Sequence, residues 1–286
     1  MSIPILLQSA YTLAATSILL ANALPPLKLR FIAYGKTSTI APSSSSSLLD
    51  KAATLTVPHR WFTHFYILGF GVSIFWAVWL VTGHGVGGGG DGMGIEQTLL
   101  AWACFAVQTA RRLYECLYIQ KSGPKSSMWI AHYLVGLLFY SATSVAVWIE
   151  GSAALAAFDF SPKTLWALIN APTLKSFMGI ITFLLASGVQ HDCHAYLASL
   201  QKYSLPQHPF FRGIVCPHYT AEVAIYLAIA LLAAPQGQLL NRTVAAAAGF
   251  VATILTVAAG TNREWYRRKF GAEKVKGRWC ILPGVY

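Results

Sequence analysis

Long apolar stretches separated by short polar segments dominate the chain. Stretches that can cross about 30 Å of hydrocarbon as helices begin near Ile3, Arg60, Ile95, Ser127, Lys175, Cys216 and Leu239. The first is too long, and too poor in preceding basic residues, for a cleaved signal peptide. We therefore expect it to be a helix of the protein. The pattern predicts an all-α, polytopic membrane protein with seven transmembrane helices.

Composition supports the same class, because 55% of the residues are hydrophobic and 11% are charged, outside the range of soluble domains. Residues 37–57, with a serine run at 43–47, indicate a mobile loop between the first two helices. No repeat of fixed period is visible, which weakens transporter interpretations based on duplicated halves. We treat residues 1–286 as a single seven-helix membrane domain.

Basic residues lie in alternate loops and in the C-terminal tail, whereas the glycine-rich second loop at 83–94 has none. The positive-inside rule then places the N-terminus in the lumen and the C-terminus in the cytosol. Topology explains the net charge of +11 without a nucleic-acid partner. The sequon that begins at Asn241 falls on the predicted lumenal side, so close to the bilayer that we expect it to be unused.

The five cysteines are scattered and odd in number, so neither a disulfide framework nor a Cys-x-x-Cys metal site is indicated. His191 and His194 could contribute to a metal site. Membrane di-iron enzymes need several histidine boxes, however, and the chain has eight histidines in all. We therefore expect no metal.

Polar residues inside apolar helices are expensive, so they indicate functional sites. In the third stretch, Gln108, Arg112 and Glu115 have i, i+4, i+7 spacing and share one helix face. Arg111 and Tyr114 lie beside them. Either this face holds an internal ion pair between Arg112 and Glu115, or it binds an anionic ligand.

Three further polar groups occur in later helices, and all are expected at cytosolic ends. Their members are Gln190, His191, His194 and, toward the loop, Lys202; then His218 and Glu222; then Asn262, Arg263 and Tyr266. Taken separately, Glu222 could be a structural carboxylate and the last group an aromatic-belt anchor. Together the groups could form one basic cavity. Arginines that bind phosphate bidentately would suit a dinucleotide with three phosphates.

At these residues the chain resembles the steroid 5α-reductase family, most closely its polyprenol-reductase branch. The matching segments are YGKT (34–37), VPHRWFTHFY (57–66), QTARRLYECLYI (108–119), QHDCHAYLASLQK (190–202), CPHYTAEVAIY (216–226), WYRRKF (265–270) and the terminal ILPGVY. They extend over nearly the whole chain in the family's order.

The resemblance implies a steroid 5α-reductase-like bundle in the endoplasmic reticulum membrane, with NADPH entering from the cytosol and a polyprenyl lipid reached from the bilayer. No obligate protein partner is evident. The cofactor shell carried over by position is Gln190, His194, His218, Glu222, Asn262 and Tyr266, with Arg111 and Arg112 near it. We add Gln108, Lys202 and Arg263 as cofactor-binding candidates.

The steroid enzymes of the family polarise a carbonyl with a glutamate and a tyrosine, whereas this chain aligns Phe65 and Thr109 there. The proton donor is therefore open. The candidate catalytic residues are His64, which falls where the steroid enzymes place a substrate-side glutamine, together with Tyr66, Tyr114 and Glu115. Hydride addition needs an electrophilic carbon, which favours a polyprenal over a polyprenol.

Other functions stay open at this point. Within the family, a 3-oxo-steroid or enoyl-lipid reductase is the first alternative, disfavoured by Phe65 and Thr109. A prenylcysteine methyltransferase is disfavoured because the tail has no paired glutamate motif. From a different class, a seven-helix lipid-binding receptor or a channel remains, and failure to bind any nicotinamide cofactor would favour it.

Overall fold

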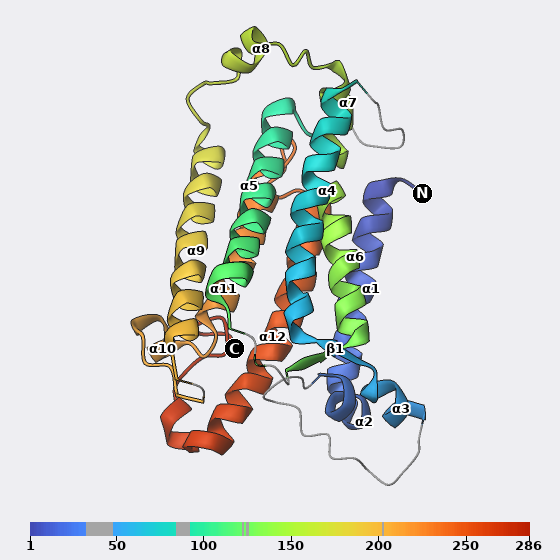
Figure 1. Cartoon of the computed structure of the whole chain (residues 1–286). Helices are drawn as coiled ribbons and strands as arrows, with labels where there is room; N and C mark the ends of the chain where they lie inside the picture. The colour runs from blue at the N-terminus through green and yellow to red at the C-terminus, as the bar shows by residue number, and fades with distance from the viewer. Residues whose placement is uncertain (33–47, 84–91, 122, 124–125, 202) are drawn as a thin grey trace.

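Long helices form a bundle in the computed structural model, which describes residues 1–32, 48–83, 92–121, 123, 126–201 and 203–286. The helices run up and down beside one another (Figure 1). The bounds of the longest are α1 Ile3–Ala23, α4 Thr63–Val81, α5 Ile95–Tyr114, α6 Ile130–Ala146, α9 Leu174–Ser199, α11 Pro217–Leu232 and α12 Arg242–Phe270. Each predicted apolar stretch contains one of these helices.

Four segments are long and apolar enough to cross a membrane, namely Ile3–Ala23, His59–Val81, Ile130–Ala157 and Arg242–Phe270. Helix α11, Pro217–Leu232, is apolar but shorter. The remaining two long helices, α5 and α9, carry the polar groups noted above, which lowers their hydropathy. The chain is a multi-pass membrane protein, and the number of seven spans stays a prediction.

Short elements connect the long helices. They are α2 Pro25–Leu27, η1 Lys28–Ile32, α3 Leu48–Thr54, β1 Thr56–Pro58, η3 His59–Phe62, η4 Glu115–Ile119, β2 Ser127–Trp129, η5 Ile149–Gly151, α7 Ser152–Ala157, α8 Pro162–Ala167, α10 Pro209–Gly213 and η6 Ala272–Val275. The elements η1 and η4 are π-helical, and η3, η5 and η6 are 3₁₀ turns.

Two predicted segments differ in detail from the structure. Residues Ser127–Trp129 form β2, which pairs antiparallel with β1, and α6 follows at Ile130, within three residues of the predicted start. The loop predicted at 37–57 contains α3 and β1, and Arg30 Nε holds α3 through Asp50 Oδ1 at 2.7 Å. Residues 37–47 of that loop lie outside the described part of the chain.

Local sequence explains where several helices begin and end. Helix α11 starts at Pro217, whose missing N–H costs nothing in the first turn. Asn241 caps α12, because its Oδ1 accepts hydrogen bonds from Thr243 N at 3.0 Å and Val244 N at 2.9 Å. Gly271 ends the same helix at φ 92°, a conformation that favours glycine.

Helix α11 lies at the centre of the packing, against α9, α12 and α5, while α4 packs on both α5 and α6. Gly136 of α6 lies against the ring of Phe65 on α4. A Cβ added there would lie 2.5 Å from Cζ of Phe65 on α4, so a larger residue would push the helices apart. The close approach positions the α4 aromatic residues against α6.

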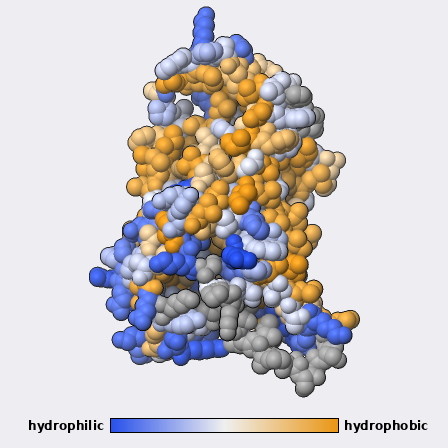
Figure 2. Space-filling view, in the orientation of Figure 1, coloured by the Kyte–Doolittle hydropathy of each residue, from blue (hydrophilic) through white to orange (hydrophobic). Residues whose placement is uncertain are grey.

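The surface divides into an apolar body and a polar end. Figure 2 shows hydrophobic residues over the middle of the visible face and hydrophilic ones at both ends, with more of them at the lower end, where Figure 1 places α10 and the C-terminal part of α12. Outward-facing leucines in the apolar part include Leu13 and Leu138, both 69% exposed. Such exposure is ordinary for a surface that faces lipid rather than water.

Candidate active site

Polar side chains fill the space where α5, η4, α9 and α11 meet. Helix direction alternates along the chain, so the C-terminal parts of α5 and α9 lie at the same end of the bundle as the N-terminal part of α11 (Figure 1). We call this group the polar cluster. Its members are Gln108, Arg111, Arg112, Glu115, Gln190, His191, His194 and Glu222.

Glu115 is the most heavily bonded carboxylate of the polar cluster and is fully buried. It forms ion pairs with Arg111 and Arg112, at i−4 and i−3 of the same helical run. From α9, Nδ1 of His191 lies 2.8 Å from Glu115 Oε1, and Nδ1 of His194 lies 2.7 Å from Oε2. The ion pair that the spacing allowed is therefore present, and it also joins α5 to α9.

Glu222 is the second carboxylate and comes from α11. Its Oε2 accepts a hydrogen bond from Gln108 Nε2 at 3.0 Å and another from Gln190 Nε2. The two amides also bond to each other, Gln108 Nε2 to Gln190 Oε1 at 3.1 Å. Burying a carboxylate requires such donors, since an unpaired one in apolar surroundings would be strongly destabilising.

The charges of the polar cluster balance, with two arginines against two glutamates when its histidines are neutral. Arg111 also donates to Gln108 Oε1 at 2.7 Å, so both guanidinium groups are engaged within the cluster. Arg111 Nε has no hydrogen-bond partner among the described residues, and the other donors of these arginines would have to be shared for the predicted phosphate-binding role. An arginine has five N–H groups, which makes sharing feasible.

Tyr66 connects the polar cluster to α4. Its hydroxyl accepts a hydrogen bond from Arg112 Nε at 3.2 Å, and the Arg112 guanidinium carbon lies 4.9 Å from the centre of the Tyr66 ring. Arg112 Nη1 is also 2.8 Å from His194 Nδ1. Of the candidate catalytic residues, the structure thus brings Tyr66 and Glu115 together through Arg112.

The other two candidate catalytic residues lie elsewhere. His64 Nδ1 is 3.0 Å from the hydroxyl of Tyr133 on α6, and His64 has no described contact with the polar cluster. Tyr114 is 53% exposed, with its ring 5.2 Å from that of Tyr118. Around the helix axis, Tyr114 lies about 100° from Glu115 and about 200° from Arg112, so it points away from the polar cluster.

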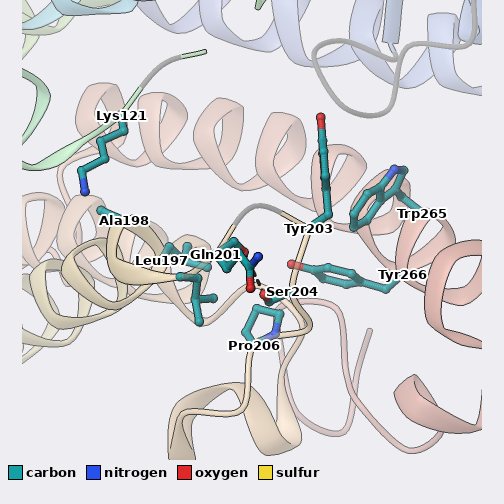
Figure 3. Close-up of a pocket in the computed structure, with 10 residues that line it drawn as sticks. Lys121, Leu197, Ala198, Gln201, Tyr203, Ser204, Pro206, Trp265 and Tyr266 are labelled. Carbon is teal, nitrogen blue, oxygen red and sulfur yellow. Dashed lines mark hydrogen bonds between the residues drawn. The ribbon is translucent and has the colours of Figure 1, made fainter.

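A pocket of about 220 Å³ opens beside the end of α12. Figure 3 shows Tyr203, Trp265 and Tyr266 grouped on one side of it, with Lys121 on the other. Lys269 Nζ lies 4.9 Å from the ring centre of Tyr203, a cation–π contact. Flat aromatic walls beside cationic residues suit a planar, anionic ligand.

A second pocket, of about 280 Å³, adjoins the same turn of α12, because Arg263 and Tyr266 are three residues apart. Its lining residues are Arg263, Gly277, Arg278, Trp279, Val285 and Tyr286. The Nε atom of Arg263 is buried and has no hydrogen-bond partner among the described residues. The C-terminal tail is held there by backbone bonds, including Val215 N to Trp279 O at 2.8 Å.

The predicted cofactor-binding residues therefore divide into groups. Gln108, Arg111, Arg112, Gln190, His194 and Glu222 meet in the polar cluster, and the ring of His218 lies 5.5 Å from that of His194. Tyr266 and Arg263 line the two pockets. Asn262 is half-buried and makes no side-chain hydrogen bond to the described residues. Lys202 lies outside the described part of the chain.

Sequence reasoning missed two tyrosines, Tyr140 on α6 and Tyr226 on α11, which are 8% and 1% exposed. They stand in apolar stretches where a tyrosine is ordinary packing material. The sequence offers one indication of a role for Tyr226: it follows Glu222 by four residues and therefore shares its helix face. In the described residues, no group of three or more histidine, cysteine or acidic side chains is arranged to hold a metal.

These features define the class of protein, a multi-pass helical membrane protein with a buried polar site at one end of the bundle. The family model for 3-oxo-5-alpha-steroid 4-dehydrogenase matches residues 155–286. The polyprenal reductase of Saccharomyces cerevisiae is 30% identical over 264 residues, covering 89% of this chain and 85% of the yeast protein.

Polyprenal reductases of a plant and an animal are also similar to this chain. Polyprenal reductase 1 of Oryza sativa subsp. indica is 27% identical, with 89% of this chain and 87% of the rice protein covered. The polyprenal reductase of Caenorhabditis elegans is 23% identical, with 88% and 85% covered. The chain belongs to the polyprenal reductase branch of the steroid 5α-reductase family.

Proposed function

We propose that this protein reduces the α-isoprene double bond of a polyprenal with NADPH, yielding the saturated aldehyde from which dolichol is made. The observation that carries the proposal is the polar cluster itself, two buried carboxylates with amide, imidazole and guanidinium partners, at the border between an apolar bundle and a polar end. Membership of the polyprenal reductase branch supports the substrate.

The chemistry favours the aldehyde as the direct substrate. A hydride adds readily to a carbon that can pass electron density to a carbonyl oxygen, and the β-carbon of a conjugated enal is such a carbon. An isolated alkene or an allylic alcohol offers no comparable electron sink. We therefore infer that polyprenol itself is reduced only after oxidation to polyprenal.

The residues of the site fit NADPH, whose bound form would supply the hydride. Arg263 and Arg278 provide guanidinium groups for phosphates, and Arg263 Nε has no partner among the described residues. Trp265 and Tyr266 offer flat surfaces for a ring. In the polar cluster, Glu222 could accept from the nicotinamide carboxamide, in competition with the amides that now bond to it.

Tyr66 and His64 remain candidate donors to the substrate. Tyr66 is polarised by Arg112, and His64 lies on α4 two residues earlier with its own partner, Tyr133. Glu115 would act through the arginines and histidines that it orients, because every contact of its carboxylate described here is to those groups. It is in that sense a positioning residue.

For the membrane arrangement, we infer seven spans in one domain, residues 1–286, in the endoplasmic reticulum membrane. The N-terminus would be lumenal and the C-terminus cytosolic. In this orientation the polar cluster and both pockets face the cytosol, where NADPH is available, and the lipid reaches the site from the bilayer. The alternation of basic loops supports this orientation.

NADPH oxidation by detergent-purified protein tests the proposal, with polyprenal, polyprenol and a 3-oxo steroid supplied separately. We expect turnover of polyprenal and none of polyprenol. The steroid is included because the C-terminal half matches the 3-oxo-5-alpha-steroid 4-dehydrogenase model. Preference for the steroid, or equal rates with polyprenol and polyprenal, would contradict the proposal.

Two glutamine variants test whether the polar cluster is the cofactor site. Glu222→Gln keeps the size but removes the acceptor charge, and loss of a charged hydrogen bond corresponds to roughly a 10- to 150-fold weaker Kd for NADPH. Glu264→Gln makes the same chemical change at an exposed site on α12 and is expected to leave the Kd unchanged. Equal Kd values for both variants would place the cofactor elsewhere.

A further inference from the structure

Three tyrosines lie where the polar cluster meets the apolar interior, one each from α4, α6 and α11. We call Tyr66, Tyr140 and Tyr226 the tyrosine layer. The rings of Tyr66 and Tyr140 are 5.1 Å apart, and Phe139 lies 5.3 Å from Tyr140 and 5.7 Å from Tyr226. All three tyrosines are 8% exposed or less. The layer thus borders both the charged residues and the apolar core.

The hydroxyl groups at this border differ in their partners. Tyr66 accepts from Arg112 Nε at 3.2 Å. Thr109, close by on α5, donates back to its own helix, with Phe105 O at 2.9 Å and Ala106 O at 3.0 Å. Its proton is therefore not available to a ligand.

The hydroxyl of Tyr226 is buried and has no hydrogen-bond partner among the described residues. A buried polar group without a partner is uncommon and requires an explanation. Tyr11 shows what a structural phenol looks like in the same bundle, since its hydroxyl is buried and lies 3.0 Å from Thr143 Oγ1. The hydroxyl of Tyr11 therefore has a well-formed partner, whereas that of Tyr226 makes no hydrogen bond of comparable geometry to the described residues.

The position of Tyr226 indicates what would satisfy it. It follows Glu222 by one helical turn on α11, so its side chain lies next to the polar cluster on its apolar side. Its electrostatic neighbours include Glu222 and Tyr66, and the side chain of Tyr140 lies close enough to interact with its hydroxyl. A ligand that is largely apolar and has one oxygen atom at its reactive end would match this position.

We propose that Tyr226 is a catalytic residue whose hydroxyl donates a hydrogen bond to the aldehyde oxygen of the lipid substrate. This inference rests on the proposed function, because it names the group that holds the reacting carbonyl of a polyprenal. Tyr140 packs between Tyr66 and Phe139 and serves to position the layer.

The reaction balances with this donor. As the β-carbon gains the hydride from NADPH, the π electrons of the carbon–carbon double bond move toward the carbonyl oxygen. The Tyr226 hydroxyl stabilises the resulting enolate oxygen, and a proton that derives from water then adds to the α-carbon. The products are the saturated aldehyde and NADP⁺.

The test compares Tyr226→Phe with Tyr11→Phe, because each variant removes one buried hydroxyl from the same bundle. For both variants and the wild type, we would measure the thermal midpoint Tm in detergent, the Kd for NADPH and the kcat with polyprenal. We expect Tyr226→Phe to lower kcat about 100-fold or more, as for loss of an oxyanion donor. Its Tm should stay level or rise, because no partner is lost, and its Kd should not change.

Tyr11→Phe should show the opposite behaviour, with a lower Tm and a kcat near that of the wild type. The proposal is overturned if Tyr226→Phe keeps kcat within about threefold of the wild type, or if its Tm falls as far as that of Tyr11→Phe. The second result would mean that the hydroxyl has a structural partner.

A binding measurement separates this inference from the proposed function. If the wild type oxidises no NADPH with polyprenal, the proposed function fails. The inference is then tested by ligand-induced thermal stabilisation of the wild type and of Tyr226→Phe. For each protein, the rise in Tm caused by polyprenal is compared with the rise caused by a polyprenyl hydrocarbon of equal length. An extra rise in the wild type that Tyr226→Phe lacks supports the oxygen contact, and equal rises in the two proteins overturn it.

Discussion

Replacing Glu115 by glutamine tests the reasoning about the polar cluster most directly. The Glu115 carboxylate is fully buried and is the counter-charge for Arg111 and Arg112. The Arg112 side chain is 5% exposed, so water cannot take over the role of the lost carboxylate. Glutamine keeps the size and one acceptor oxygen but leaves two guanidinium groups with Glu222 as the remaining carboxylate of the polar cluster, an excess of one positive charge.

The expected size of the effect follows from burial. Removing one partner of a buried ion pair costs about 3–5 kcal/mol of unfolding free energy, because an uncompensated charge stays inside. At roughly 2–4 °C per kcal/mol for a chain of this size class, Tm should fall by roughly 6–20 °C. A thermal melt of the detergent-purified protein measures this directly.

Glu264 is a close internal control. It also pairs with two arginines three and four residues away, Arg267 at 3.3 Å and Arg268 at 2.9 Å, but its side chain is 45% exposed. Exposed pairs contribute about 0–1 kcal/mol, so Glu264→Gln should shift Tm by no more than a few degrees. Equal shifts for the two variants would refute the argument that burial decides the cost. Adding Arg112→Leu to Glu115→Gln should restore part of the loss, since it removes one uncompensated cation.

Three further predictions concern the opposite end of the bundle. Asn241→Ala removes the cap of α12 and should lower the unfolding free energy by about 1 kcal/mol in a thermal melt. Asn241 is also fully buried, so the folded protein should show no mobility shift on gels after treatment with a glycosidase; a shift that is lost in Asn241→Gln would contradict this. Gly151→Ala would place a Cβ 1.9 Å from Thr98 Oγ1 and should cost about 1–3 kcal/mol, with partial recovery in a Thr98→Ala background; a neutral Gly151→Ala would show that the contact is not rigid.

Much of the fold could be predicted from the sequence, because lipid imposes a simple requirement. Every backbone polar group in hydrocarbon needs an internal partner, so long apolar stretches become helices. The helices begin within a few residues of their predicted starts. The exception was the short pair of strands, Thr56–Pro58 with Ser127–Trp129. A short strand forms only with a partner that is distant in the sequence, and hydrophobic periodicity does not indicate that partner.

The site was predictable in composition but not in contacts. The cost of burying charge made Arg112, Glu115, Gln190 and Glu222 conspicuous in the sequence, and the alternating direction of the helices placed them at one end. Which residue bonds to which followed only from helix packing. Packing made Glu115 the partner of both arginines and turned Tyr114 outward.

The sequence by itself therefore determined the membrane class, the helical segments and the depth at which the polar residues lie. These depend on hydropathy and helix length, which are properties of single segments. Only the tertiary structure decided that Tyr226 has a buried hydroxyl without a described partner and that Tyr11 has one. Whether a buried polar atom is satisfied depends on the neighbouring helices, and no single segment contains that information.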